Sequence, residues 1–149
     1  MPKVDLSRIE ENNRTGYPEP YSNDVAGRWA RRLAPALGLE DFGANLVRLE
    51  PGAWSSQRHW HEEEDEVLVM LEGEAVLVED DARTILKPGD VAAWRKGVRN
   101  GHHLVNESDS DCRFFVVGRA PSGDCHYPDI DLHVDGATNS YVHKDGSPY

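Results

Sequence analysis

Seven short runs of β-forming residues between positions 44 and 119 constrain the fold more than any other feature of the sequence. They are separated by Gly, Pro, Asp, Asn and Ser at roughly 8–12-residue spacing, which is typical of antiparallel sandwiches and barrels. The sequence shows neither an alternation of strands with helices nor an internal repeat. We therefore predict an all-β fold. The runs are ANLVRLE, EVLVMLEG, EAVLVED, ARTILKPGD, VAAWRKG, HHLVNES and CRFFVVG.

The rest of the chain is expected to belong to the same domain as this central region. A chain of 149 residues has the length of one ordinary domain. At that length about 68–70% of the unfolded surface can be buried, so no disulfide framework is needed. We predict an N-terminal arm with a short helix over residues 1–43 and the barrel core over residues 44–119. Residues 120–149 are predicted to form a C-terminal extension that packs on the barrel or on a partner subunit.

The predicted helix covers about residues 24–34. Ser22 or Asn23 offers an N-cap before a stretch in which Trp29 and Arg32 recur at helical spacing. Pro35 is expected to end it, since proline does not continue a helix.

Charge and hydropathy exclude several classes of function. The chain has 16 basic and 27 acidic residues, and its net charge of -11 repels nucleic acid and anionic membranes. Neither an apolar run near the N-terminus nor a stretch of about 18 apolar residues is present, so we expect a cytoplasmic protein without a membrane segment. Cys112 and Cys125 form no recognisable motif and are read as ordinary buried thiols.

The stretch RHWHEEEDEVLVMLEG, residues 58–73, carries the first candidate site. On a strand, residues i and i+2 point to the same face, so His59 and His61 should project together. Residues 62–65 are all acidic and are read as a solvated turn. Glu66 instead opens an apolar strand, where an unpaired carboxylate needs a cation or strong donors. A hairpin would return Glu66 to the two histidines, and the three residues together indicate a metal site.

The same stretch resembles the first sequence motif of the cupin superfamily. That motif runs from a glycine through a His-x-His pair and a glutamate to a second glycine. Here these positions are Gly52, His59, His61, Glu66 and Gly73, with a one-residue difference in the first spacer.

A second cupin motif finds its counterpart in GDVAAWRKGVRNGHHLVN, residues 89–106. Arg95 stands where proline is usual, and four residues rather than two separate Gly97 from His102. His102 keeps the motif's spacing to Asn106, so the resemblance favours His102 as the fourth ligand, in a lengthened loop. If the strand register held instead, Asn100 would occupy the ligand position and the site would have three protein ligands; His103 is the other candidate.

The resemblance implies a cupin jelly-roll barrel, a double-stranded β-helix, with a short N-terminal helix. It also implies one divalent metal held by His59, His61, Glu66 and His102. Imidazole and carboxylate ligands suit Fe, Mn, Ni or Zn and leave one or two positions open for water or substrate. The sequence does not choose among these metals.

Small single-domain cupins that end with a Tyr-Pro-Asp-x-Asp-Leu segment are similar to this chain, and many are provisionally labelled sugar-phosphate isomerases. The resemblance therefore implies an enzyme acting on a small polar metabolite. Two alternatives remain open, an Fe(II) dioxygenase acting on a chelating acid and a non-catalytic cupin that binds or senses a small ligand. Arg48, Arg95, Arg113 and Tyr127 are possible substrate-binding residues, and a homodimer is expected.

Overall fold

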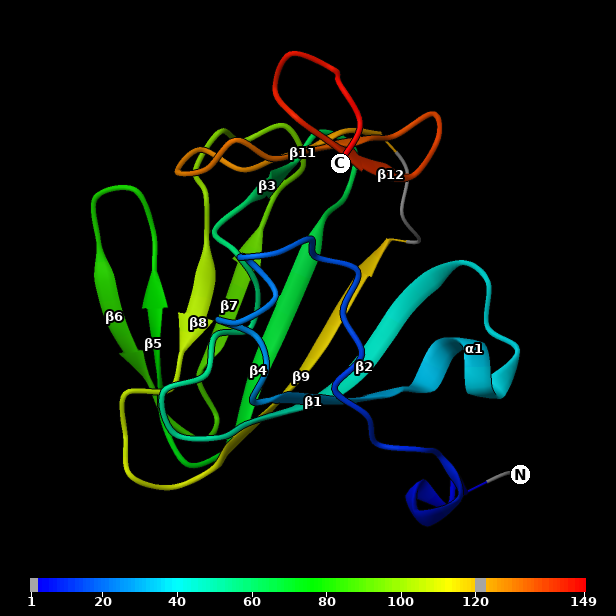
Figure 1. The fold of residues 1–149 in the computed structure, drawn as a ribbon. Coiled ribbons are helices and arrows are strands. Elements are labelled where there is room, and N and C mark those ends of the chain that lie inside the picture. The colour runs from blue at the N-terminus through cyan, green and yellow to red at the C-terminus, as the bar shows by residue number, and fades with distance from the viewer. Residues whose placement is uncertain (1–2, 120–122) are drawn as a thin grey trace.

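The computed structural model describes residues 3–119 and 123–149, which form three antiparallel sheets (Figure 1). The large sheet has the strand order β1-β2-β9-β4-β7, with β1 Arg28–Arg32, β2 Phe42–Leu49, β9 Cys112–Arg119, β4 Glu66–Glu72 and β7 Val91–Trp94. The second sheet has the order β6-β5-β8, with β6 Arg83–Leu86, β5 Ala75–Val78 and β8 His103–Val105. The third has the order β12-β11-β10-β3, with β12 Ser140–Val142, β11 His133–Asp135, β10 Cys125–His126 and β3 Trp60–His61.

The helical content is small. A single 3₁₀ turn, η1, covers Leu6–Arg8, and a single short helix, α1, covers Leu33–Leu37 among the described residues. All seven runs predicted as strands form strands, so the all-β prediction with one short helix is confirmed. Within the described ranges, no helix has the length and apolar character needed to cross a membrane.

The main core lies between the large sheet and the β6-β5-β8 sheet. Leu49, Leu68 and Met70 of the large sheet pack in one cluster with Leu77 and Leu104 of the smaller sheet. The two sheets thus face each other as the two walls of a barrel, and the side chains on their inner faces meet.

Strand register decides which side chains of the large sheet face the interior. Leu68 on β4 lies opposite Val116 on β9, and Val116 lies opposite Asn45 on β2. Asn45 in turn lies opposite Arg32 on β1. Paired residues share a face of the sheet, and so do alternate residues along a strand. Arg32 and Glu66, which is two residues before Leu68, therefore belong to the same inner face although they lie on different strands.

The position of the helix differs from the sequence-based prediction. Residues 28–32, predicted as helix, form the edge strand β1, in which all five residues pair with β2. Helix α1 instead begins at Leu33 and ends before Gly38, whose φ of 69° provides a left-handed C-cap. Pro35 lies in its first turn, where no backbone N–H is needed. The prediction of a helix over 24–34 was therefore wrong, because non-local pairing overrides local helical spacing.

The described part of the C-terminal extension covers one end of the barrel, at the top of Figure 1. Strand β10 pairs with β3, so Cys125 lies opposite His61. Tyr127 and Leu132 form a second core cluster with Tyr17 of the N-terminal arm. Residues 123–149 therefore pack on the barrel itself; the predicted boundary at residue 120 lies outside the described residues.

Asn106, the last residue of the second sequence motif, is a structural residue. It is fully buried, and its Nδ2 donates hydrogen bonds to the carbonyl oxygens of Leu49 at 2.9 Å and Ser110 at 2.8 Å. Its Oδ1 accepts from the N–H and hydroxyl of Ser108. One side chain thus fixes the turn that leads into β9.

We expect Asn106→Ala to lower the free energy of unfolding by about 2–4 kcal/mol, because the buried carbonyl oxygen of Leu49 loses its donor and the turn loses its buried side-chain hydrogen bonds. Ser108→Ala, which removes a more exposed partner, should lower it by less than about 1 kcal/mol. Urea denaturation of the two variants measures both values. Equal effects of the two substitutions would contradict this role for Asn106.

Candidate metal centre

Three histidines and one glutamate converge at one end of the barrel interior. The ring centroids of His59 and His61 are 4.7 Å apart, and those of His59 and His102 are 5.0 Å apart. Glu66 Oε2 lies 3.5 Å from His102 Nε2 and 3.9 Å from His61 Nε2. Ligand atoms of His59, Glu66 and His102 all lie within 4.8 Å of one another. The structure therefore brings together the four side chains that the sequence proposed as metal ligands.

Backbone pairing positions these side chains. His59 and His102 form a β-bridge in which each N–H donates to the other's carbonyl oxygen, at 3.2 and 2.9 Å. His61 follows on β3, with the same parity as His59, and Glu66 is the first residue of β4. Trp94, opposite Glu66 on β7, stacks on the His102 ring with the two centroids 4.0 Å apart.

Two of the imidazoles are oriented by backbone carbonyl groups. His59 Nδ1 lies 2.9 Å from the carbonyl oxygen of Gln57, and His102 Nδ1 lies 3.4 Å from that of Asn100. A carbonyl oxygen accepts only from a protonated nitrogen, so the lone pair of each neutral ring is on Nε2. Within residues 3–119 and 123–149, His102 Nε2 is the one buried side-chain nitrogen or oxygen without a hydrogen-bond partner. A metal ion would satisfy this atom.

Burial keeps His59 and His61 neutral, and the neighbouring histidines keep Glu66 charged. Burial, followed by the neighbouring His102 and His61, lowers the pKa of His59 to about 3. The pKa of His61 is also lowered, chiefly by burial. For Glu66, burial raises the pKa, but the contact with His102 and the other two histidines outweighs it and the net shift is downward. Neutral imidazoles and an ionised carboxylate are the forms that bind a metal.

Glu64 corrects the prediction that all four acids of residues 62–65 are solvated. Its side chain is only 16% exposed, and Oε2 lies 3.4 Å from His61 Nδ1. Burial, followed by repulsion from Glu66, raises the pKa of Glu64 to about 8. Room for it comes from Gly118, because a Cβ there would lie 2.2 Å from Glu64 Oε1. The sequence offered no sign of this, since Gly118 is distant along the chain.

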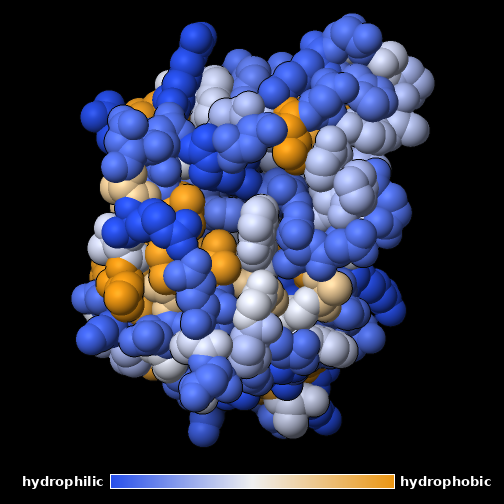
Figure 2. Space-filling view, turned by 60° about the vertical axis from the view of Figure 1, so that its left-hand side comes forward, coloured by the Kyte–Doolittle hydropathy of each residue, from blue (hydrophilic) through white to orange (hydrophobic). Residues whose placement is uncertain are grey.

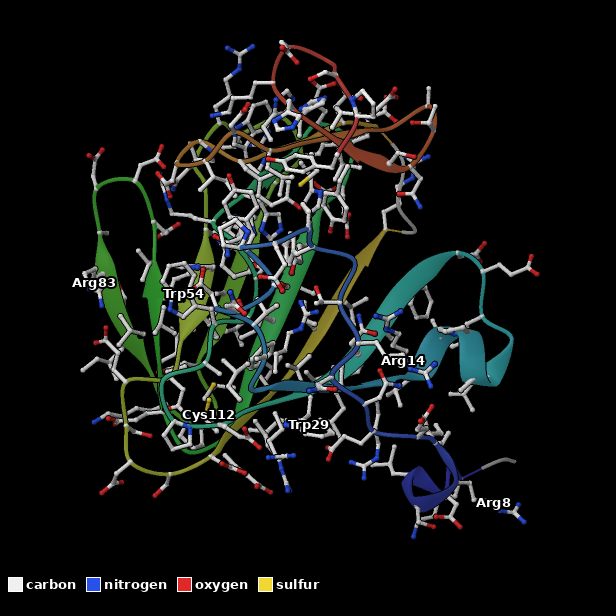
Figure 3. The ribbon with its side chains drawn as sticks, viewed as in Figure 1. Arg8, Arg14, Trp29, Trp54, Arg83 and Cys112 are labelled. Atoms are coloured by element: carbon white, nitrogen blue, oxygen red, sulfur yellow. The ribbon has the colours of Figure 1, made fainter. Side chains whose placement is uncertain are left out.

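The loop before β8 has the lengthened form that favours His102 over His103. Asn100, at the position where strict motif spacing would place a ligand, binds Glu79 and the backbone of Asp80 through its side chain instead. His103 points away from Glu66, with Nδ1 2.9 Å from the carbonyl oxygen of Ser56 and its ring against Trp54. Trp54 lies over β8 in Figure 3. This geometry makes His102 the better candidate.

Three of the four side chains adjoin a cavity of ≈ 500 Å³, large enough for a small metabolite. His59, Glu66 and His102 lie along its wall. Much of the remaining wall is apolar, and its lining includes Val47, Leu68, Leu104, Phe114 and Val116. Arg28 and Arg32 of β1 also line it, and sequence reasoning missed both as binding residues because their segment was assigned to a helix.

The arginines proposed from the sequence as substrate-binding residues lie elsewhere. Arg48 pairs with Asp111 at 2.8 Å and stacks over Trp29, and Arg113 pairs with Glu72 at 3.3 Å. Both occupy the outer face of the large sheet, because they alternate with inward-facing residues. Arg95 is exposed and lines a separate surface pocket. The structure thus places none of these three in the lining of the cavity.

The fourth proposed substrate-binding residue, Tyr127, and the two cysteines are buried. Tyr127 packs with its ring 5.8 Å from that of His59, behind the histidines rather than in the cavity lining. Cys112 and Cys125 are free and buried, as predicted.

A second cluster of metal-binding residue types lies at the β12-β11-β10-β3 sheet. Ligand atoms of Asp124, His126 and His133 lie within 4.8 Å of one another. Each histidine already has a carboxylate partner, since His126 Nε2 is 2.9 Å from Glu62 and His133 Nε2 is 3.0 Å from Asp124. This cluster is separate from the cavity and provides a control for metal measurements.

We expect His102→Ala and His103→Ala to separate the two candidates for the fourth ligand. Loss of His102 should weaken metal binding by more than the roughly 10–100-fold that is typical for an outer-shell partner. His103→Ala should leave the affinity nearly unchanged, because His103 does not contact Glu66. Metal titration of the two folded variants measures this, and a larger loss with His103→Ala would overturn the assignment.

In the metal-free protein, His59 should remain neutral far below its usual pKa. Its pKa of about 3 lies below the unfolded value of about 6.5. The unfolded chain therefore binds more protons between these values, and this residue makes the fold less stable as pH falls through that window. NMR of the imidazole should show no His59 titration between about pH 5 and 8. A midpoint near 6.5 would contradict the burial of this ring.

The comparisons with known proteins agree with this architecture. A family model for the cupin domain matches residues 45–118, while a search of curated proteins gives no significant match. Two solved proteins are similar at low identity. A predicted oxalate decarboxylase from Thermotoga maritima has a TM-score of 0.63 and 24% identity, covering 78% of this chain and 97% of that one. A polyketide cyclase from Streptomyces resistomycificus has a TM-score of 0.65 and 22% identity, covering 80% and 79%.

A third solved structure is much more similar. It is described as a sugar phosphate isomerase of a cupin superfamily from Silicibacter pomeroyi, and it has a TM-score of 0.92 to this structure. The two sequences are 44% identical over 99% of this chain and 96% of that one. The two more distant proteins show the fold alone, whereas this identity over nearly the full length of both chains establishes that the protein belongs to the cupin superfamily.

Proposed function

We propose that this protein is a divalent-metal-dependent enzyme that isomerises a small polar metabolite, a sugar or a sugar phosphate. One observation carries the proposal. His102 Nε2 is buried without a hydrogen-bond partner, 3.5 Å from Glu66, at the wall of a cavity of ≈ 500 Å³. An atom in that position is costly to bury unless a ligand occupies it.

The residues present fit a first-row divalent metal. His59, His61 and His102 offer neutral imidazole nitrogens and Glu66 offers a carboxylate, a donor set that suits Fe, Mn, Ni or Zn. When bound, such an ion acts as a Lewis acid that polarises a carbonyl group. Isomerisation of a sugar requires this polarisation, because the proton next to the carbonyl must become acidic.

The protein's own side chains prepare the site for such chemistry. Trp94 stacks on His102 and holds the plane of its ring. Apolar residues such as Leu68 and Phe114 form much of the wall beside it, and a low-dielectric wall strengthens electrostatic contacts in the cavity. The cavity therefore combines a rigid polar end with a largely apolar wall.

The similar protein from Silicibacter pomeroyi supports this reaction type, because it is described as a sugar phosphate isomerase and is 44% identical. An Fe(II) dioxygenase acting on a chelating acid uses the same residue types and is the second candidate. A non-catalytic cupin that binds a small ligand is the third. Metal identity and turnover distinguish the three.

We also propose that the protein is a homodimer, with a small molecule rather than nucleic acid or a membrane as its other partner. Val67, Leu71 and Val91 are 40%, 44% and 61% exposed on the outer face of β4 and β7. Figure 2 shows one face of the molecule, on which hydrophobic side chains gather at one side of a largely hydrophilic surface. Contiguous apolar surface of this kind is typical of interfaces.

Elemental analysis of protein purified without chelators should find about one equivalent of metal per chain. His59→Ala combined with His61→Ala should lose it, because half of the ligands are removed. His126→Ala combined with His133→Ala is the matched control and should retain the metal. Metal that survives the first pair of substitutions but not the second would contradict the proposed site.

Activity is tested by incubating the metal-loaded protein with aldose phosphates and free aldoses in deuterium oxide. We expect ketose formation with deuterium at the carbon next to the carbonyl, lost on chelation and regained on adding the metal. Binding of these compounds without any conversion would contradict the enzyme and favour the ligand-binding alternative. Iron in the site with oxygen uptake on a chelating acid would instead favour the dioxygenase.

A further inference from the structure

We propose that Arg28 and Arg32 form an anion-binding subsite in the cavity and hold a phosphate or carboxylate group of the ligand. The inference deepens the proposed function and rests on it, since it assigns the second end of a ligand whose first end lies at the metal centre.

Both arginines reach the cavity because of strand register. Arg28, Ala30 and Arg32 alternate along β1 and lie opposite Leu49, Val47 and Asn45 of β2. Leu49 and Val47 are buried in the main core, so this face of β1 is the inner face. Arg28 and Arg32 line the same cavity as His59 and Glu66.

Within residues 3–119 and 123–149, the two guanidinium groups donate hydrogen bonds to neutral acceptors and to no carboxylate. Arg28 Nη1 donates to the carbonyl oxygen of Ser55 at 2.9 Å, and its Nη2 lies 3.5 Å from the carbonyl oxygen of Arg14. Arg32 Nη2 lies 3.4 Å from that same oxygen. The backbone of Arg14, which Figure 3 places beside the large sheet near α1, therefore links the two guanidinium groups. A guanidinium has five N–H donors, so most donors of both groups remain available to a ligand.

Among the described residues, Arg28 and Arg32 lack a carboxylate partner, although acidic residues outnumber basic ones in the whole sequence, 27 to 16. Within the described residues Arg8, Arg95 and Arg99 also form no ion pair, but these three are exposed and lie outside the cavity lining, whereas the other arginines are paired. Arg31, on the opposite face of the same strand, binds Glu11 at 3.0 Å, and Arg58 binds Asp129 at 2.6 Å. Within the part of the chain that the structure describes, neither Arg28 nor Arg32 has a carboxylate within ion-pair distance.

Electrostatics favour an anion between these groups. Burial lowers the pKa of Arg28, and the charge of the neighbouring Arg32 acts in the same direction. Arginine nevertheless stays protonated in proteins, so the cavity retains two like charges, one on the half-buried Arg28 and one on the exposed Arg32. A phosphate or carboxylate relieves their repulsion and accepts bidentate hydrogen bonds. The two arginines also offset, within the cavity, the net charge of -11 that repels anions at long range.

The placement selects a ligand with two different ends. β1 and β4 are separated by three strand spacings, or about 14 Å between backbones along the sheet. The arginines and Glu66 therefore line the cavity at separate positions along the same inner face of the sheet. A ligand that carries an anionic group at one end and a metal-binding oxygen at the other fits this arrangement.

Calorimetric titration of the metal-loaded protein with inorganic phosphate, and separately with acetate, tests the subsite. We expect binding of at least one of these anions. Arg28→Gln and Arg32→Gln should each weaken it by about tenfold or more, because charge-assisted hydrogen bonds are lost. Arg32 is exposed at its strand end, so Arg32→Gln remains informative if Arg28→Gln fails to fold.

Arg113→Gln is the matched control, since it removes the same charge from the outer face of the sheet. It should change the affinity by less than about twofold, because exposed pairs contribute little. Tighter binding of phosphate than of acetate would identify a phosphorylated ligand, and the reverse a carboxylate ligand; both results support the subsite. Equal affinity in wild type, Arg28→Gln and Arg32→Gln, or binding of neither anion, would overturn it.

The same titration on metal-stripped protein separates this inference from the proposed function. Phosphate held by the arginines should still bind after the metal is removed and should still depend on Arg28. Anion binding that is lost with the metal and does not depend on Arg28 would mean that the anion binds to the metal. This result would overturn the subsite while leaving the metal centre intact. If the wild type takes up no metal even on reconstitution, but its phosphate affinity still depends on Arg28, the proposed function alone is overturned.

Discussion

The antiparallel register of the large sheet is the constraint on which the rest of the structure depends. It places Glu66 of β4 and the two cavity-lining arginines of β1 on one face, although β1 and β4 are not neighbours. Since side chains alternate strictly along a strand, a shift of one residue between β1 and β2 would turn Arg28 and Arg32 outward. It would also turn Arg31 inward, away from its carboxylate partner Glu11. Register therefore decides both the chemistry of the cavity and the pairing of the outer surface.

Desolvation explains why the two ends of the cavity call for ligands. At one end, burial keeps His59 neutral and leaves Nε2 of His102 without a partner. At the other, the guanidinium groups of the half-buried Arg28 and the exposed Arg32 contact backbone carbonyl oxygens and, within the described residues, no carboxylate. Buried polar groups are normally satisfied, because an unmade hydrogen bond costs about 1–3 kcal/mol and a charged group more. A cation at the first end and an anion at the second satisfy both, and this complementarity is the reason to treat the cavity as one binding site.

Much of this arrangement was predictable from the sequence. The seven strands follow from period and turn residues, and the parity of His59, His61 and Glu66 follows from strand geometry together with one hairpin.

Three features were not predictable. Residues 28–32 have helical spacing but pair with β2, a contact that only the complete sheet provides. Glu64 lies in an acidic run that reads as solvated, yet Gly118 from a distant strand gives it space. The arginine end of the cavity was not predicted, because residues 28–32 were assigned to a helix. Arg48 and Arg113 were proposed instead, but their carboxylate partners lie on the outer face of the sheet.

The central claim is that the barrel interior, rather than the protein surface, holds the metal. Crystals of protein reconstituted with one candidate metal at a time, measured with X-rays on both sides of its absorption edge, locate the ion directly. The account predicts an anomalous difference peak beside His59, His61, Glu66 and His102, at the wall of the cavity. A peak confined to the cluster of Asp124, His126 and His133 at the β12-β11-β10-β3 sheet would contradict it. So would the absence of a peak with Fe, Mn, Ni and Zn alike.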